Sequence, residues 1–296
     1  MFPTLPTLHY AKVLLCALAL QSAVLVHGLP TDTTDINLDL DVDEAFPTIN
    51  ATNAAFFQGA SSQAAIPAPL AQFPSGLLNR FLRILSTLPQ GEQALDGIGR
   101  ILTPLQQALA NAVGIETTKS DLARNAPCAD MTLVYARGTT EPGNMGLVTG
   151  PPFVDALKKE LGTKSLAVQG VEYPATFAGF NKNGAEGVPS MTNFINQALT
   201  KCPNTKVVIS GYSQGALVLR STADKLPAET MAKISSVVTF GDPRNPNAIK
   251  GSEGKTLITC HENDAVCKGG FITIDHLTYA QDAPAVAKFV VQKAQV

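Results

Sequence analysis

The chain has 296 residues and a formal net charge of −2, and 45% of its residues are hydrophobic. This length allows one large domain, or one domain with an extension. The absence of a basic excess argues against a nucleic-acid partner, and no apolar run after residue 28 is long enough to span a membrane.

The first 28 residues are typical of a secretory signal peptide. Lys12 precedes an apolar core that runs from Val13 to Val26, and His27 and Gly28 complete the positions expected around a cleavage site. We therefore expect residues 1–28 to be removed and the mature chain to be secreted. A short buried helix or a membrane anchor is the alternative interpretation.

Residues 29–73 are predicted to be disordered. An acidic run between Asp32 and Glu44 contains no Lys or Arg, and a stretch rich in Ala, Ser and Pro follows it. Such a composition buries too little apolar surface to offset the entropy lost on ordering. Asn50-Ala51-Thr52 is a glycosylation sequon, which makes Asn50 a candidate for modification in a secreted protein.

Residues 74–125 are predicted to form a helical extension. Apolar residues recur at helical spacing in three places: 77–85, 95–102, and a third segment that begins at Thr103-Pro104 and continues to Val113. The apolar faces of these helices must cover something. The sequence leaves two interpretations open, a pro-segment packed on the following domain and a lid over an apolar site.

Residues 126–296 show the alternation of an α/β domain. The sequence predicts strands at 132–136, 166–171, 206–211, 236–241 and 256–261. Helices are predicted at 152–161, 188–200, 214–225, 228–233 and 283–293. This alternation indicates a doubly wound, five-stranded parallel sheet covered by helices on both faces. In such a sheet the functional site lies beyond the carboxyl ends of the strands.

A candidate nucleophile follows the third predicted strand. Gly211-Tyr212-Ser213-Gln214-Gly215 has the G-x-S-x-G pattern, with a β-branched run before it and a helical pattern after it. This strand–turn–helix context is the one that a nucleophile elbow requires. The glycines leave room for a tight turn that exposes the Ser213 hydroxyl.

A serine nucleophile needs a base, and the mature chain offers two histidines. Hydrolases of this architecture place them in the order serine, acid, histidine. His276 precedes the last helix and is the predicted general base, whereas His261 ends a strand and is predicted to be structural.

Three aspartates compete for the third position of the triad. Asp264 follows the last strand and lies between Cys260 and Cys267, which could close a short loop around it. Asp242 also follows a strand and is the second candidate. Asp275 is discounted because the side chains of neighbouring residues usually diverge from each other.

Two backbone donors are expected to form an oxyanion hole. The N–H of Gln214, directly after the nucleophile, is one of them. The loop after the first strand of the domain offers the other, at Thr139.

The cysteines give a further constraint on the fold. Cys16 leaves with the signal peptide, and the remaining four, Cys128, Cys202, Cys260 and Cys267, suggest two disulfides with three possible connectivities.

Four blocks of this sequence resemble the signature blocks of the cutinase family. They are Cys128-Ala129-Asp130 with Ala136 to Gly143, Gly211 to Gly215, Asn263 to Cys267, and Asp275 to Tyr279. The resemblance implies a compact, secreted α/β-hydrolase over residues 126–296, with Ser213, Asp264 and His276 as triad. It also implies Thr139 and Gln214 as oxyanion pair, and disulfides Cys128–Cys202 and Cys260–Cys267.

This sequence departs from the family pattern in two places. Thr139 stands where many members have serine, and the extension before Cys128 is absent from the compact members. Since threonine also carries a hydroxyl, only the effect of the extension on substrate access is left open.

The expected activity is carboxylic ester hydrolysis through an acyl-enzyme, without a metal or another cofactor. Apolar residues in loops near the proposed site favour fatty-acyl esters or cutin-type polyesters: Phe177, Phe180, Val266, Phe271 and Ile272. An acetylxylan esterase or a lipase-like esterase is the alternative, and a secreted binding or effector protein on a hydrolase scaffold is the alternative outside enzymes. A monomer is expected.

Overall fold

The computed structural model describes residues 66–88 and 92–296. The predicted signal peptide, the candidate glycosylation site Asn50 and most of the predicted disordered segment lie outside the described residues. Within the described part of the chain, no helix combines the length and the apolar character that crossing a membrane requires.

A five-stranded sheet lies at the centre of the fold, and every neighbouring pair of its strands is parallel. The spatial order is β2-β1-β3-β4-β5. The strands are β1 (Met131–Ala136), β2 (Leu166–Gly170), β3 (Lys206–Tyr212), β4 (Ile234–Phe240) and β5 (Thr256–Thr259). The predicted fold class, a doubly wound five-stranded parallel sheet, is confirmed.

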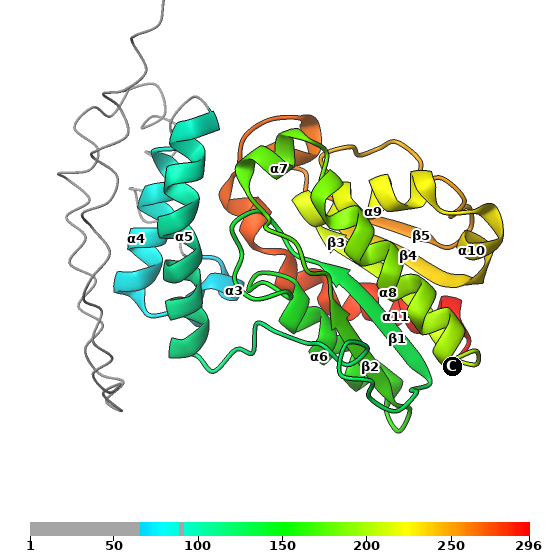
Figure 1. Cartoon of the computed structure of the whole chain (residues 1–296). Helices are drawn as coiled ribbons and strands as arrows, with labels where there is room; N and C mark the ends of the chain where they lie inside the picture. Colours follow the sequence, from blue (N-terminus) through cyan, green and yellow to red (C-terminus); the bar gives the residue numbers. More distant parts are fainter. Residues whose placement is uncertain (1–65, 89–91) are drawn as a thin grey trace, which may run out of the picture. The chain divides into compact units, whose positions relative to one another are not determined.

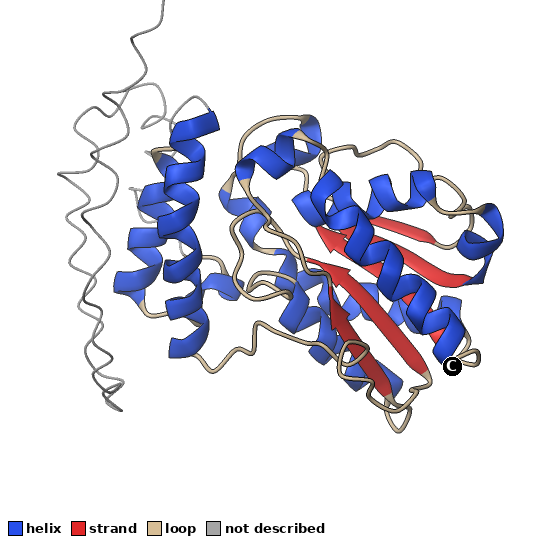
Figure 2. Ribbon diagram, viewed as in Figure 1, coloured by secondary structure: helices blue, strands red, loops and turns tan. Residues whose placement is uncertain are grey.

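Helices cover both faces of this sheet (Figures 1 and 2). They are α6 (Gly150–Leu161) and α11 (Ala283–Ala294) on one face, and α8 (Val188–Lys201), α9 (Gln214–Lys225) and α10 (Ala228–Lys233) on the other. Alternate residues of a strand pack against the helices on opposite faces of the sheet. Leu133 and Tyr135 of β1 pack with α6 and α11, whereas Val134 packs with α8 and α9. The central strands are therefore buried along almost their whole length.

Loops at the carboxyl ends of the strands carry the short elements. These are α7 (Phe177–Asn181) and η1 (Ala185–Gly187) after β2, and η2 (Ala265–Lys268), η3 (Ile274–Leu277) and η4 (Tyr279–Asp282) after β5. The structure contains two disulfides, Cys128–Cys202 and Cys260–Cys267. They are the two pairs that the family resemblance implies.

In the described part of the chain, three helices precede the sheet: α3 (Ala68–Ala71), α4 (Ser75–Ser86) and α5 (Glu92–Ala112). Two features differ from the sequence prediction. Residues 66–73, predicted to be disordered, include α3, because Leu70 and Phe73 are buried in the same apolar cluster as α4 and α5. The proline at 104 lies inside α5 and does not begin a separate helix.

The apolar stripe of α5 explains why this helix continues through its proline. Ile98 and Leu102 lie before Pro104, Leu105 and Leu109 lie after it, and all four are buried in one cluster. Burial of this continuous stripe compensates for the backbone hydrogen bond that the proline removes.

Candidate active site

Ser213 occupies a strained turn between β3 and α9. Its backbone has φ +55° and ψ −116°, a conformation that residues with a side chain rarely adopt. Both flanking glycines are required by space. A Cβ at Gly211 would lie 2.2 Å from the carbonyl oxygen of Gly215, and one at Gly215 would lie 1.9 Å from that of Ala136. The turn therefore has the crowding that the sequence pattern predicts.

His276 and Asp264 form a buried pair after β5. Nδ1 of His276 lies 2.7 Å from Oδ2 of Asp264, whose Oδ1 accepts the backbone N–H of Val266 at 2.9 Å. Burial acts to raise the pKa of Asp264, but the hydrogen bonds that it accepts, chiefly from His276, outweigh burial and lower this pKa. Nε2 of His276 is buried and has no hydrogen-bond partner among the described residues.

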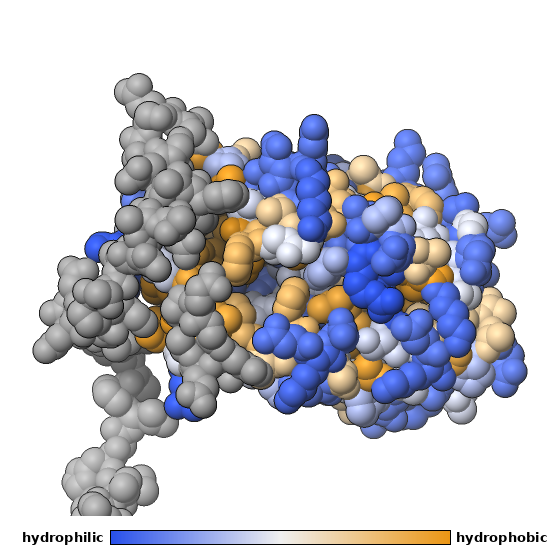
Figure 3. Space-filling model, turned by 90° about the horizontal axis from the view of Figure 1, so that it is seen from above, coloured by the Kyte–Doolittle hydropathy of each residue, from blue (hydrophilic) through white to orange (hydrophobic). Residues whose placement is uncertain are grey.

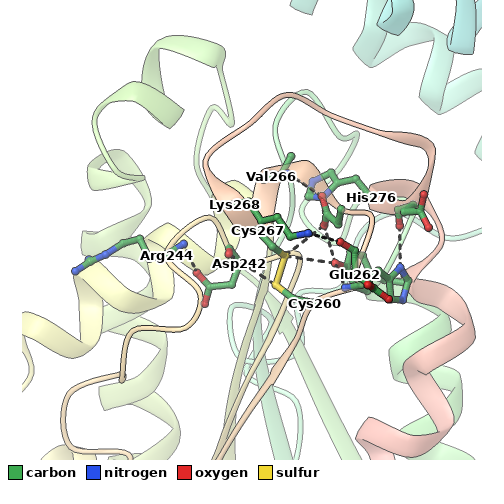
Figure 4. The surroundings of a disulfide bond; sticks show 12 residues. Asp242, Arg244, Cys260, Glu262, Val266, Cys267, Lys268 and His276 are labelled. Carbon is green, nitrogen blue, oxygen red and sulfur yellow. Dashed lines mark hydrogen bonds and ion pairs between the residues drawn. A yellow bond between two sulfur atoms is a disulfide. The ribbon is translucent and has the colours of Figure 1, made fainter. Parts of the chain in front are cut away.

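The Cys260–Cys267 disulfide closes the loop that carries Asp264 (Figure 4). The bridge links the end of β5 to η2, and Lys268 adds a further tie by donating to the carbonyl oxygen of Glu262 at 2.6 Å. Asp264 caps η2 through its bond to Val266. A loop held in this way fixes the carboxylate that orients His276.

The other acids and the second histidine have separate partners. Both carboxylate oxygens of Asp242 accept from Nε of Arg220, at 2.9 and 2.8 Å, and both side chains are buried. Asp242, the second candidate for the triad, is thereby engaged in an ion pair away from His276. His261 binds Asp282 through Nε2 at 2.6 Å. The structure therefore brings Asp264, and neither Asp242 nor His261, into the pair with His276.

Thr139 and Gln214 meet beside Ser213. Gln214 is the first residue of α9, so its backbone N–H has no acceptor within the helix. Among the described residues, the N–H of Thr139 also has no acceptor, although those of Gly138 and Thr140 do. The hydroxyl of Thr139 donates to Oε1 of Gln214 at 3.2 Å. This bond ties together the two residues predicted to form the oxyanion hole.

Glu141 belongs to the candidate site and was not predicted from the sequence. Its buried carboxylate accepts the N–H groups of Gly138 at 2.7 Å and of Leu147 and Val148 at 2.8 Å each. Burial raises the pKa of Glu141, and the three N–H groups oppose this rise. The available signal was its charge, because it is the sole charged residue between 138 and 150. Glu141 fixes the loop that presents Thr139.

Two helices of the extension close a cavity over these residues. Phe81 and Leu85 of α4 and Gln106 of α5 line it together with Ser213 and His276. The volume of this cavity that the centre of a water-sized molecule can occupy is about 30 Å³. Ser213 is 5% exposed and His276 is 1% exposed. The helical extension therefore shields the candidate nucleophile and base from solvent.

The predicted apolar rim is only partly found at this cavity. Phe177 and Ile272 line it. Val266 is buried beneath the site, Phe180 is half-buried, and Phe271 is 73% exposed. None of these last three lines the cavity. Phe81 and Leu85 replace them, and no spacing within the catalytic domain could have indicated residues from the extension.

Helix α5 also makes polar contacts with the oxyanion loop. The carbonyl oxygen of Thr140 accepts from the hydroxyl of Thr103 at 2.7 Å and from Nε2 of Gln106 at 3.1 Å. Nε2 of Gln106 also donates to the Thr140 hydroxyl at 3.1 Å. Thr140 has φ +62°, an unusual value for a β-branched residue. Helix α5 thus contacts the residue directly after the candidate oxyanion donor.

Comparison with known proteins decides the family. Residues 127–294, more than half of the chain, match the family described as Cutinase. The chain belongs to the cutinase family. Among its relatives, "Cutinase" of Hypocrea jecorina is 41% identical over 216 residues, which cover 72% of this chain and 85% of the relative. "Cutinase pbc1" of Pyrenopeziza brassicae is 43% identical and covers 67% of this chain and 97% of the relative.

A solved structure agrees with these relatives. "Trichoderma reesei cutinase in complex with a C11Y4 phosphonate inhibitor" has a TM-score of 0.65 and 40% identity, and covers 73% of this chain and 98% of its own. A match of 216 residues is longer than the family's span of 127–294, so the similarity reaches into the helical extension. As a member of the cutinase family, this protein is a serine carboxylic ester hydrolase.

Proposed function

We propose that this chain hydrolyses fatty-acyl esters and cutin-type polyesters outside the cell, with Ser213, His276 and Asp264 as its triad. One observation carries the proposal: a strained serine and an unpaired imidazole nitrogen line one cavity, and a buried carboxylate orients the imidazole. The cutinase relatives support the substrate class. The two disulfides support an oxidising, extracellular compartment.

The reaction proceeds in two halves. Nε2 of His276 takes the proton of the Ser213 hydroxyl while Oγ attacks the ester carbonyl carbon, and Asp264 stabilises the imidazolium. The N–H groups of Thr139 and Gln214 bind the resulting oxyanion. His276 then gives its proton to the departing alcohol, which leaves an acyl-enzyme on Ser213. Water, activated by His276, releases the acid and restores the serine.

The walls of the cavity favour an acyl chain. Phe81, Leu85, Phe177, Ile272 and Leu277 are apolar and lie around the cavity that contains Ser213. An apolar wall gains free energy by burying methylene groups, at about 0.8 kcal/mol for each, and gains little from the hydroxyls of a sugar. The cavity therefore favours fatty-acyl esters over acetylated xylan.

A substrate series tests this choice. We expect kcat/KM on dissolved aryl esters to rise from acetyl to longer acyl groups, and a cutin-like polyester to be degraded. Acetylated xylan should be a poor substrate. Initial rates for all three classes, with each substrate incubated without enzyme as the blank, give the comparison. A preference for acetylated xylan would favour the acetylxylan esterase alternative.

We further propose that α4 and α5 are a lid that opens to admit substrate. Only about 30 Å³ of this partly open cavity is available to the centres of water-sized molecules. Ser213 is 5% exposed and His276 is 1% exposed, so wider access to the two side chains needs the helices to move. The buried faces of α4 and α5 are apolar, and Figure 3 shows, from above, hydrophobic residues among hydrophilic ones on the visible surface of the described residues. An ester–water interface offers the same apolar faces another partner and shifts the population towards open.

The energies involved are small enough for a lid. A lid that is closed 99% of the time needs a preference of about 2.7 kcal/mol. Full burial of a single leucine contributes about 1.5–3 kcal/mol. Leu78, Leu102 and Leu109 are among the buried residues of the cluster that joins α4, α5 and Leu277. A closed state of this strength is compatible with opening at an apolar surface.

Gln106→Ala is expected to raise the rate on dissolved short esters several-fold. The variant removes two hydrogen bonds that hold α5 on Thr140, and each is worth about 1 kcal/mol of the closed state. Gln107→Ala is the matched control, since Gln107 binds Asn111 and Thr117 and does not reach Thr140. Initial rates on dissolved and dispersed esters measure the effect. If the rate on dissolved esters rises equally in both variants, or rises in neither, Gln106 does not hold the lid closed.

Removal of the extension separates the lid from a pro-segment. A chain that starts near Asn125 should hydrolyse dissolved esters faster than the full mature chain, and an oil–water interface should narrow the difference. If the truncated chain folds and has the same rates as the full mature chain, on dissolved esters and on dispersed esters, the helices are no lid. A truncated chain that fails to fold would favour the pro-segment interpretation, because the helices would then be needed to form the domain.

A further inference from the structure

The carboxylate of Asp264 has a second side-chain donor besides His276. The hydroxyl of Tyr279, from η4, lies 2.6 Å from Oδ2 of Asp264. This is the same oxygen that binds Nδ1 of His276 at 2.7 Å. The other oxygen is bound to the backbone of Val266. The oxygen that faces the histidine is therefore shared between an imidazole and a phenol.

The direction of the Tyr279 hydroxyl is fixed by a third group. The backbone N–H of His261 points at Oη of Tyr279 at 3.0 Å, and an N–H group can only donate. The hydroxyl proton of Tyr279 is thereby directed to Asp264. Burial, and next the hydrogen bond to Asp264, raise the pKa of Tyr279, so the phenol remains a neutral donor.

Packing holds the Tyr279 ring in this position. The ring is fully buried and stacks on the His261 ring, with centroids 4.1 Å apart and an angle of 21° between the planes. His261 is in turn held by Asp282. Phe240 contacts Tyr279 edge-on, with centroids 6.2 Å apart. His261, which the triad does not use, serves to fix the tyrosine by its ring and its backbone.

We propose that Tyr279 is a positioning residue of the triad, whose hydroxyl fixes the Asp264 carboxylate and withdraws negative charge from the oxygen that binds His276. This inference rests on the proposed function, because it assigns a role relative to Asp264 and His276. A hydrogen bond donated to a charged group is among the stronger ones in a buried site. Its loss therefore changes both the orientation and the charge of the acid.

The sign of the effect on pH dependence follows from electrostatics. Without the phenol, Oδ2 of Asp264 carries more negative charge and holds the imidazolium form of His276 more strongly. The neutral imidazole that acts as base then forms only at higher pH, so the acidic limb of the kcat/KM profile moves upward.

Other titratable groups also surround the pair within the described chain. They are Tyr212 of β3, Glu141 of the oxyanion loop, Asp275 of η3, and His261 and Asp282 behind Tyr279. All of them are retained when Tyr279 loses only its hydroxyl. A shift of the limb in such a variant is therefore assigned to the hydroxyl itself.

Tyr279→Phe tests the proposal, with Tyr212→Phe as the matched control. Tyr212 is also buried beside His276, but its hydroxyl donates to the neutral carbonyl oxygen of His276 at 2.8 Å. In Tyr279→Phe we expect kcat to fall roughly 10-fold with KM unchanged, and the acidic limb to rise by about 0.5 to 1 pH unit. In Tyr212→Phe the limb should stay in place. An unmoved limb in the first variant, or equal shifts in both, would overturn the proposal.

A second variant keeps the test decisive if Tyr279→Phe does not fold. 3-Fluorotyrosine at position 279 retains the ring and the hydroxyl but is a stronger donor, so the limb should move to lower pH. A limb that stays in place or rises would overturn the proposal. Ser213→Ala separates this failure from failure of the proposed function. If that variant still hydrolyses esters, the triad is wrong; if it is inactive, an unmoved limb refutes the role of Tyr279 alone.

Discussion

Ser213→Ala is expected to lower turnover by roughly 10⁶-fold while the fold is retained. The substitution removes the oxygen that forms the acyl-enzyme, so only substrate binding and the oxyanion donors remain. Ser213 lines the cavity and a serine-to-alanine change removes a single oxygen there, so its loss should cost little stability. Turnover of a dissolved aryl ester and the thermal unfolding temperature measure the two effects.

Ser210→Ala is the matched control for this variant. Ser210 lies three residues earlier on β3, and its buried hydroxyl also has no partner in the described part of the chain. It lies within the sheet and does not line the cavity. This variant should hydrolyse esters at close to the parental rate. A Ser213→Ala enzyme that retained a tenth of the parental turnover would remove Ser213 from the mechanism.

Asp264→Asn is expected to reduce turnover by about 10⁴-fold and to leave KM nearly unchanged, by analogy with the corresponding change in serine proteases. The amide can offer an N–H to Nδ1 of His276, which favours the wrong tautomer, and it cannot stabilise the imidazolium. At pH 7 the effect should be fully present, because the pKa of Asp264 is lowered and the parental carboxylate is ionised. Single-turnover kinetics would separate this loss from a binding defect.

Asp242→Asn should give the opposite profile. Arg220 would be left as a buried charge without its carboxylate, and breaking such a pair costs about 3–5 kcal/mol. The folded fraction should retain its turnover, since Asp242 does not contact His276. Chemical denaturation measures the loss of stability. If Asp242→Asn loses turnover and Asp264→Asn does not, the second candidate for the acid is correct.

Local patterns were sufficient to predict the sheet. The three central strands, β1, β3 and β4, are buried along almost their whole length. The glycines at 211 and 215 indicate from the sequence the crowding that the structure has around Ser213. Helix α9 was predicted with the observed bounds because its start is set by the turn before it. Pro104 was misread, since the burial that keeps α5 continuous depends on partners far away in the chain.

Local sequence patterns alone did not predict the long-range pairings. Asp242 and Asp264 both follow strands, and contacts far away in the chain distinguish them. Asp242 pairs with Arg220, 22 positions away, and Asp264 pairs with His276, 12 positions away. The contact of Gln106 with Thr140 spans 34 positions, and no periodicity encodes it. The sequence predicts which faces are apolar, but it does not specify which surface each face will meet.

The hydrogen bonds that the Glu141 carboxylate accepts have a consequence for transferring the helical extension to another protein. Its carboxylate joins the N–H of Gly138, beside Thr139, to those of Leu147 and Val148, which pack in the apolar cluster of α4 and α5. A graft of these helices onto a relative that lacks them therefore has to include residues 138–148. Without that loop, the grafted helices would lack the surface that Leu147 and Val148 provide. Substitutions that recreate this surface would act on Thr139, the candidate oxyanion donor, through the carboxylate of Glu141.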